Sequence, residues 1–189
     1  MYLFVGLGNP GPQYANNRHN IGFMAIDEII DSYGFSPEKA KFGGVYSEGH
    51  IDQHKVICFK PLTYMNKSGI PTAQIASFYK IPLDHIFVFH DDLDLVDSKV
   101  RVKQGGGSGG HNGLKSLDFH LGNDYWRVRI GIDHPGSKEQ VTGYVLQNFS
   151  KLEMAWVASL VDAMADEAHL LISGNPNNFT SKVMQDLGK

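Results

Sequence analysis

The sequence predicts an α/β fold in a single domain, with a twisted mixed β-sheet sandwiched between helices. Short runs rich in β-branched and aromatic residues are bounded by turn-forming residues, which is the pattern of strands. Segments with apolar residues on one helical face lie between these runs. The chain has 189 residues, of which 42% are hydrophobic, and this length suits one domain with a substantial core.

Six strands are predicted, enough for one sheet. The first begins at the N-terminus, where the apolar run has no basic flank and soon meets Gly-Asn-Pro-Gly, so we interpret it as a strand and not as a signal peptide. No apolar stretch approaches the length that crosses a membrane. The predicted strands cover residues 2–7, 44–51, 54–60, 85–90, 98–103 and 126–132.

Helices are predicted between the strands and in the last third of the chain. Ser150 and Glu153 have the spacing of a capping box, and the apolar residues that follow recur every four positions. Gly174 is expected to end this helix, as a glycine just past a helix does. The predicted helices cover residues 23–33, 68–79, 150–174 and 178–187.

The single cysteine, Cys58, lies in an apolar run and is predicted to be a buried structural thiol. One cysteine excludes a disulfide framework within the chain. A protein without disulfides suits a reducing compartment, so we expect a cytoplasmic location.

The net charge of −3 argues against a protein that coats nucleic acid broadly, because such binding needs many cationic contacts to phosphate. A local basic patch is compatible with it. Lys99, Arg101 and Lys103 alternate along one predicted strand, and Arg127 and Arg129 repeat this period on another. Residues two apart on a strand face the same side, so these side chains form either a small basic wall or a solvated strand face.

Three glycine-rich or acidic motifs have other possible interpretations. Residues 6–11 match the dinucleotide-binding pattern, but Pro10 and Pro12 impose a turn where that motif needs a helix with free N–H groups. Ser108 lies in a match to the G-x-S-x-G pattern, but with five glycines around it such a match is expected by chance. A flexible loop is therefore favoured over a serine nucleophile. Residues 90–94 are compatible with a metal half-site, an acidic strand end, or an aspartate that orients a histidine.

Taken together and in order, six segments resemble bacterial-type peptidyl-tRNA hydrolases, and the resemblance extends from Met1 to the last helix. It implies a phosphorylase/hydrolase-like α/β fold and an esterase that cleaves the bond between a peptide and the 3′ ribose of tRNA, without metal or cofactor. The matching segments are Val5–Gly11 with Tyr14, Arg18–Gly22, Pro61–Gly69, His90–Asp94, Gly105–Leu114, and Arg129–Ile132 continuing into His134–Gly136.

By this resemblance His19 is the base that activates water, and Asp91 orients its imidazole and stabilises the protonated form. The chemistry agrees, because ester hydrolysis needs an activated water and a histidine titrates near neutral pH. The resemblance also implies that Lys103 and Arg129 bind the 5′ phosphate of tRNA. The residues expected to bind the rest of the substrate are Asn9, Tyr14, Tyr64, Met65, Asn66 and Asn112.

Two positions depart from the family pattern. Tyr64 stands where phenylalanine is common, and Asp92 stands where glutamate is usual. Since Asp92 follows Asp91 on a strand, we expect it to point away from the site. The family further implies a lid-like segment at about 135–148, and we expect a monomer whose partner is peptidyl-tRNA. A non-catalytic RNA-end-binding domain and a serine esterase based on Ser108 are the alternatives.

Overall fold

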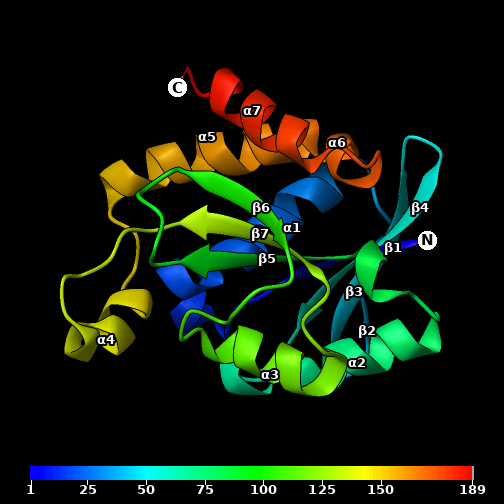
Figure 1. The fold of residues 1–189 in the computed structure, drawn as a ribbon, viewed down its shortest axis with the longest axis horizontal. Coiled ribbons are helices and arrows are strands. Elements are labelled where there is room, and N and C mark those ends of the chain that lie inside the picture. Colours follow the sequence, from blue (N-terminus) through cyan, green and yellow to red (C-terminus); the bar gives the residue numbers. More distant parts are fainter. Residues whose placement is uncertain (189) are drawn as a thin grey trace.

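A computed structural model describes residues 1–188, which form a seven-stranded sheet between two helical layers (Figure 1). The strand order is β2-β3-β4-β1-β5-β7-β6. Strands β4, β1, β5 and β7 are parallel, whereas β2, β3 and β6 run antiparallel to their neighbours, so the sheet is mixed as predicted. The strands are β1 (Tyr2–Gly6), β2 (Lys39–Lys41), β3 (Gly44–Ile51), β4 (His54–Pro61), β5 (Ile86–Asp92), β6 (Val100–Gln104) and β7 (Trp126–Gly131).

The two helical layers cover opposite faces of the sheet (Figure 1). The larger layer contains α1 (Ile21–Ser32), α5 (Lys151–Glu167), α6 (His169–Ile172) and α7 (Pro176–Asp186), and the smaller contains α2 (Gly69–Phe78) and α3 (Asn112–Leu121). Side chains alternate between the two cores along each central strand; on β1, for example, Phe4 faces the larger layer while Leu3 and Val5 face the smaller. The short helix α4 (Val141–Val145) stands apart from both layers in this view.

Short 3₁₀ turns follow several strand ends, and two of them, η2 and η3, contain predicted site residues. Because parallel strands end at the same edge of a sheet, the segments after β1, β4, β5 and β7 meet there. The turns are η1 (Pro12–Tyr14), η2 (Arg18–Asn20), η3 (Met65–Lys67), η4 (Leu83–His85) and η5 (Lys138–Gln140).

The structure confirms most predicted elements and corrects several. The capping box at Ser150 is present, with Ser150 Oγ accepting from the Glu153 N–H at 3.1 Å. The helix that it begins is interrupted at Ala168, so Gly174 ends α6 and not one continuous helix. Strand β2 and helix α3 were not predicted. Cys58 is buried, and none of the helices within residues 1–188 has the length and apolar character needed to span a bilayer.

Helix α1 begins in very close contact with the strand ends, and only glycine fits at its second residue. A Cβ at Gly22 would lie 2.3 Å from the carbonyl oxygen of Phe89 and 2.7 Å from the amide nitrogen of Leu7. Both of these atoms belong to the backbone and have no rotamer to change. The close approach brings the turn before α1 against the end of β5.

We therefore expect Gly22→Ala to destabilise the protein by about 2 kcal/mol or more, because the added methyl overpacks a backbone contact. Gly143→Ala is the matched control, since no atom lies within 4 Å of its Cβ position. Alanine favours a helix by up to about 1 kcal/mol over glycine, so this control should be neutral or slightly stabilising. Urea denaturation of both variants measures the difference, and equal midpoints would contradict the steric argument.

Candidate active site

A cleft of about 390 Å³ opens at the edge of the sheet where the parallel strands end. Its wall includes the residues after β1 and β4, the end of β5, the glycine segment 105–110 and part of α4. Most of the predicted site residues meet here although they are far apart in sequence. Those that line the cleft are Asn9, His19, Tyr64, Met65, Asn66, Asp91, Lys103, Asn112 and Arg129.

The centre of the cleft is a carboxylate held between two imidazoles. Asp91 Oδ2 lies 2.8 Å from His19 Nδ1, and Asp91 Oδ1 lies 2.8 Å from His111 Nε2. His19 is carried by turn η2 and His111 precedes α3, so two loops converge on the end of β5. The pairing of His19 with Asp91 agrees with the predicted dyad, whereas the contribution of His111 was not predicted.

The electrostatics of this cluster follow from burial and from opposite charge. Burial alone would raise the pKa of Asp91, but the neighbouring His19 and His111 outweigh it and keep the pKa well below its usual range. For His19 the signs are reversed: burial lowers its pKa, but the charge and hydrogen bond of Asp91 outweigh burial and raise the pKa above its ordinary value. Burial and the nearby His111 lower the pKa of His90 to about 4, so that ring is neutral at physiological pH.

The same three side chains, His19, Asp91 and His111, are the only group within residues 1–188 that brings three potential metal ligands together, with ligand atoms within 4.8 Å of one another. Each Asp91 oxygen already accepts from one imidazole. An ion at this position would have to replace both hydrogen bonds.

Asn9 is fixed in orientation by its neighbours. Asn20 accepts from the Asn9 N–H at 2.9 Å and donates to the Asn9 carbonyl at 2.9 Å, like a paired strand. Asn9 Oδ1 in turn accepts from the Met65 N–H at 2.7 Å. With Oδ1 held by the Met65 N–H, the Nδ2 donor of Asn9, which has no partner within the described residues, is available to another molecule.

The other predicted substrate residues differ in their surroundings. Asn66 and Asn112 are exposed in the cleft, and within the described part of the chain neither side-chain amide has a hydrogen-bond partner. Tyr64 is 59% exposed, which excludes a core-packing role. Tyr14 is not part of the cleft wall; it packs edge-on against Tyr64, with ring centroids 6.5 Å apart.

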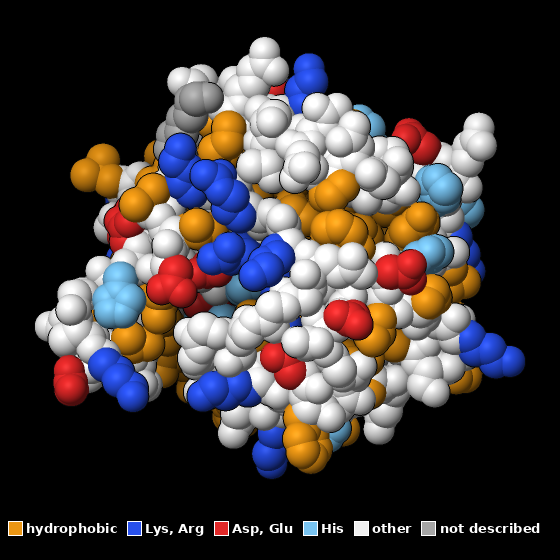
Figure 2. Space-filling model, viewed as in Figure 1, with side chains coloured by type: hydrophobic (Ala, Val, Ile, Leu, Met, Phe, Trp, Pro, Cys, Tyr) orange, Lys and Arg blue, Asp and Glu red, His pale blue; other side chains and the backbone are white. Residues whose placement is uncertain are grey.

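A basic surface adjoins the cleft, and Figure 2 shows lysine and arginine side chains gathered at the centre of this face with acidic side chains beside them. Lys103 of β6 and Arg129 of β7 both line the cleft. The expectation that Asp92 points away from the site is wrong. Asp92 lines the same cleft and accepts from Arg129 Nε at 2.7 Å, because alternation along a strand does not separate its last residues from a cleft at the strand's own edge.

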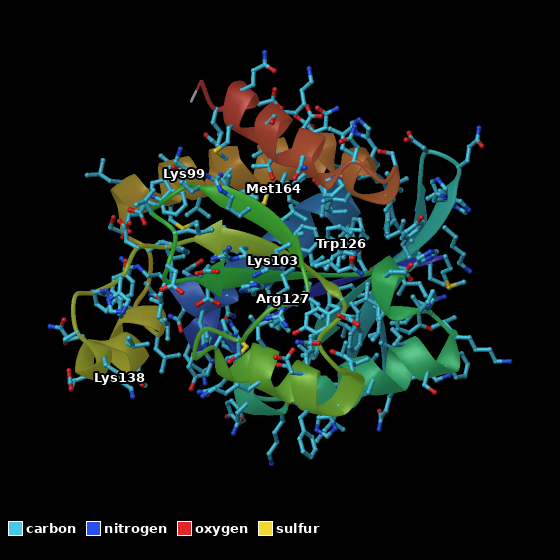
Figure 3. The ribbon with its side chains drawn as sticks, viewed as in Figure 1. Lys99, Lys103, Trp126, Arg127, Lys138 and Met164 are labelled. Carbon is cyan, nitrogen blue, oxygen red and sulfur yellow. The ribbon has the colours of Figure 1, made fainter. Side chains whose placement is uncertain are left out.

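Arg127 lies next to Lys103, on the neighbouring strand, as Figure 3 shows. Unlike the rest of the expected basic wall it is only 2% exposed. Its guanidinium donates to the Gly107 carbonyl at 2.6 Å and to Asp118 Oδ1 at 2.9 Å. Arg127 therefore holds the glycine segment through a hydrogen bond to its backbone and is not exposed to solvent.

Ser108, considered as an alternative nucleophile, lies in the cleft wall. Among the described residues, no histidine or carboxylate contacts its hydroxyl. The arrangement around Ser108 thus lacks the base that a serine nucleophile requires.

The fold and the cleft define the protein first as an α/β protein in which a histidine and a carboxylate meet at the carboxyl edge of a parallel sheet. The family model for peptidyl-tRNA hydrolase matches residues 3–188. The chain is 55% identical to the peptidyl-tRNA hydrolase of Rhodospirillum centenum, over 97% of this chain and 81% of that protein. It is 54% identical to that of Acidiphilium cryptum, over 97% and 96%.

A solved structure agrees. The peptidyl-tRNA hydrolase of Acinetobacter baumannii superposes with a TM-score of 0.91 at 39% identity, covering 97% of this chain and 94% of that one. The chain belongs to the peptidyl-tRNA hydrolase family, whose members cleave the ester bond of peptidyl-tRNA. The predicted family, fold class and activity are confirmed.

The geometry makes a testable statement about His19. In Asp91→Asn the carboxylate charge is removed while burial remains, so the pKa of His19 should fall from above its ordinary value to below it. Titration of the His19 ring by NMR measures this directly. Asp92→Asn removes an adjacent carboxylate that pairs with Arg129 instead, and it should move the pKa of His19 much less. Equal shifts in the two variants would mean that Asp91 is not the main influence.

Proposed function

We propose that His19 is the general base of the hydrolysis and that Asp91 positions it. The observation that carries this is the bond between His19 Nδ1 and the buried Asp91 carboxylate, inside a cleft that also presents free amide groups. With Nδ1 donating to Asp91, the neutral imidazole has its lone pair on Nε2. Nε2 takes a proton from water, and the resulting hydroxide attacks the ester carbon.

The proton then completes the reaction. The tetrahedral intermediate expels the 3′ oxygen of the ribose, and the imidazolium of His19 returns the proton to that oxygen. Asp91 stabilises the imidazolium between these steps, as the acid of a triad does. His111 donates to the second oxygen of Asp91 and keeps the carboxylate in the orientation that His19 needs.

Asn9 is proposed to read the acylated nitrogen of the substrate. Its Nδ2 is a donor, and a donor is matched by the carbonyl oxygen of a peptide bond. A free aminoacyl-tRNA presents a cationic amine instead, which finds no acceptor at this position and is poorly solvated there. Asn66 and Asn112 offer further amides to the peptide or the terminal ribose. Tyr64 and Met65 contribute apolar contacts, and Tyr14 packs against the Tyr64 ring.

Lys103 and Arg129 are proposed to bind the 5′ phosphate of the tRNA. They come from adjacent antiparallel strands and both reach the cleft, which explains how a chain of net charge −3 binds RNA at one end only. We further propose that the segment 135–148, which includes η5 and α4, is a lid-like edge of the cleft. The proposed mechanism requires no cofactor and no metal. We further propose that the protein acts as a monomer in the cytoplasm.

Cleavage of N-acetylated aminoacyl-tRNA tests the catalytic assignment. His19→Ala should lower kcat by about 10² or more, because general-base catalysis contributes at least that factor. Asp91→Asn should cost less, since a misoriented base still acts poorly. Ser108→Ala separates the alternatives: a loss of activity confined to this variant would indicate a serine esterase. Unblocked aminoacyl-tRNA is the substrate control, and equal rates on both substrates would remove the proposed role of Asn9.

Binding of tRNA at several salt concentrations tests the phosphate assignment. Lys103→Ala and Arg129→Ala should weaken binding, and each should reduce the log–log salt slope by about one unit or less, because one cation fewer neutralises the phosphate. Lys55→Ala is the matched control, because Lys55 pairs with Glu48 and takes no part in the cleft. On a minimal substrate that ends in the CCA nucleotides alone, all three variants should resemble the parent protein. Equally weakened activity on both substrates would instead assign these cations to the fold.

A further inference from the structure

Helix α4 forms one wall of the cleft yet belongs to neither helical layer. Four of its residues or immediate neighbours line the cleft, namely Val141, Thr142, Val145 and Leu146. Figure 1 shows α4 at one end of the molecule, reached by a long extended connection from β7. Val145 is buried in the core of the larger layer, and the Tyr144 hydroxyl donates to the Ile132 carbonyl. Beyond these contacts, the position of the wall depends on the side chains that connect it to the turn before α1.

Arg18, which directly precedes His19, connects α4 to this turn. Its side chain is buried, and Nη2 donates to both carboxylate oxygens of Glu153 at 2.9 and 3.0 Å. Nη1 donates to Gln147 Oε1 at 3.0 Å. The guanidinium also lies 4.2 Å from the ring centre of Tyr144, the fourth residue of α4. One side chain thus contacts α4, the residues just after it and the start of α5.

The backbone reinforces this contact. The N–H of Arg18 donates to the Gln147 carbonyl at 3.1 Å, and the N–H of Phe149 donates to the Asn16 carbonyl at 3.0 Å. Between them Asn17 forms an isolated β-bridge with Asn148. Residues 16–18 and 147–149 are consequently paired like two short strands, and His19 is the next residue of the first one.

The arrangement is costly if stability were its only purpose. The Nε of Arg18 is buried and has no hydrogen-bond partner among the described residues. Removing a guanidinium from water costs free energy that an ion pair with the partly exposed Glu153 seldom returns in excess of what apolar packing would give, and in some proteins such pairs serve to fix one geometry. The charge on Arg18 is therefore better explained by what it aligns than by the stability it adds.

We propose that Arg18 is a positioning residue of the reaction, which sets the α4 wall of the cleft relative to the turn that carries His19. The inference rests on the proposed function, since the wall is taken to contact peptidyl-tRNA. Without the Arg18–Glu153 pair, α4 occupies more positions and binds the substrate less well. Glu153 takes no part in the hydrogen bond between His19 and Asp91, so the rate of the chemical step should be preserved.

Steady-state kinetics on N-acetylated aminoacyl-tRNA provide the test. Glu153→Gln keeps the acceptor that caps α5 at the Ser150 N–H but removes the charge that binds Arg18. This variant and Arg18→Met should each raise KM about tenfold, as expected when hydrogen bonds to a charged group are removed, with kcat within about threefold of the parent. The double variant should be no worse than the more impaired single variant, because both changes break the same ion pair.

Hydrogen exchange gives a second readout that needs no activity. Amides of residues 141–147 should exchange about tenfold faster in Glu153→Gln than in the parent, since the opening free energy of α4 falls with the pair. Glu48→Gln is the matched control, because Glu48 pairs with Lys39 and Lys55 at the far side of the sheet. It should alter neither KM nor this exchange. If Arg18→Met does not fold, Glu153→Gln decides the question alone.

The outcomes are distinct. A lower melting temperature with unchanged KM and unchanged exchange would show a merely structural Arg18 and overturn the proposal. A fall in kcat at constant KM would also overturn it, because Arg18 would then act on His19 and not on the wall. If the parent protein itself fails to cleave the substrate, the proposed function fails, while the exchange result still reports on the link between Arg18 and α4.

Discussion

The ionised carboxylate of Asp91, buried at the end of β5, is the constraint around which the rest of the site is arranged. A buried charge without partners would cost several kcal/mol, so the fold must deliver opposite charge or strong donors to that position. It does so with His19 and His111, which come from opposite sides of the sheet, one before α1 and one before α3. Each loop is thereby held at the end of β5, and this contact fixes where the two following helices, α1 and α3, begin.

The surrounding groups divide into those that are fixed and those that are free. Asn9 has its backbone and its amide oxygen engaged, and Arg127 supports the glycine segment through the Gly107 carbonyl. Asn66 and Asn112 instead present unpaired amides at the cleft wall of the described chain. Fixed groups avoid the entropy of ordering when a ligand arrives, while unpaired amides can turn to suit ligands of different shape. In the proposed function, a rigid centre with an adaptable rim suits the recognition of one ester bond in substrates with many peptide sequences.

Sequence reasoning recovered the fold class, the central strands and most of the cleft because these depend on periodicity and on motifs at strand ends. It failed where long-range partners decide. Arg18 and Arg127 are charged and would be expected at the surface, yet each is buried because Glu153 or Asp118 meets it from a distant element. His111 was overlooked among glycines for the same reason, since only the folded chain shows that it contacts Asp91. Strand β2 has only three residues, all exposed, so it is too short to show the alternation over four or more residues that predicts strands.

The contact between Asp92 and Arg129 has a consequence for selectivity in a cell rich in small anions. Arg129 donates its Nε to the Asp92 carboxylate at 2.7 Å, so an anion that approaches the guanidinium also meets the negative charge of Asp92. On the proposed role of Arg129 as a phosphate contact, inorganic phosphate and free nucleotides therefore gain little by entering the cleft. A phosphate that arrives attached to a larger molecule brings contacts elsewhere that offset this weakness. If Arg129 binds the tRNA phosphate as proposed, Asp92 disfavours abundant small anions while the tRNA, with its other contacts, still binds.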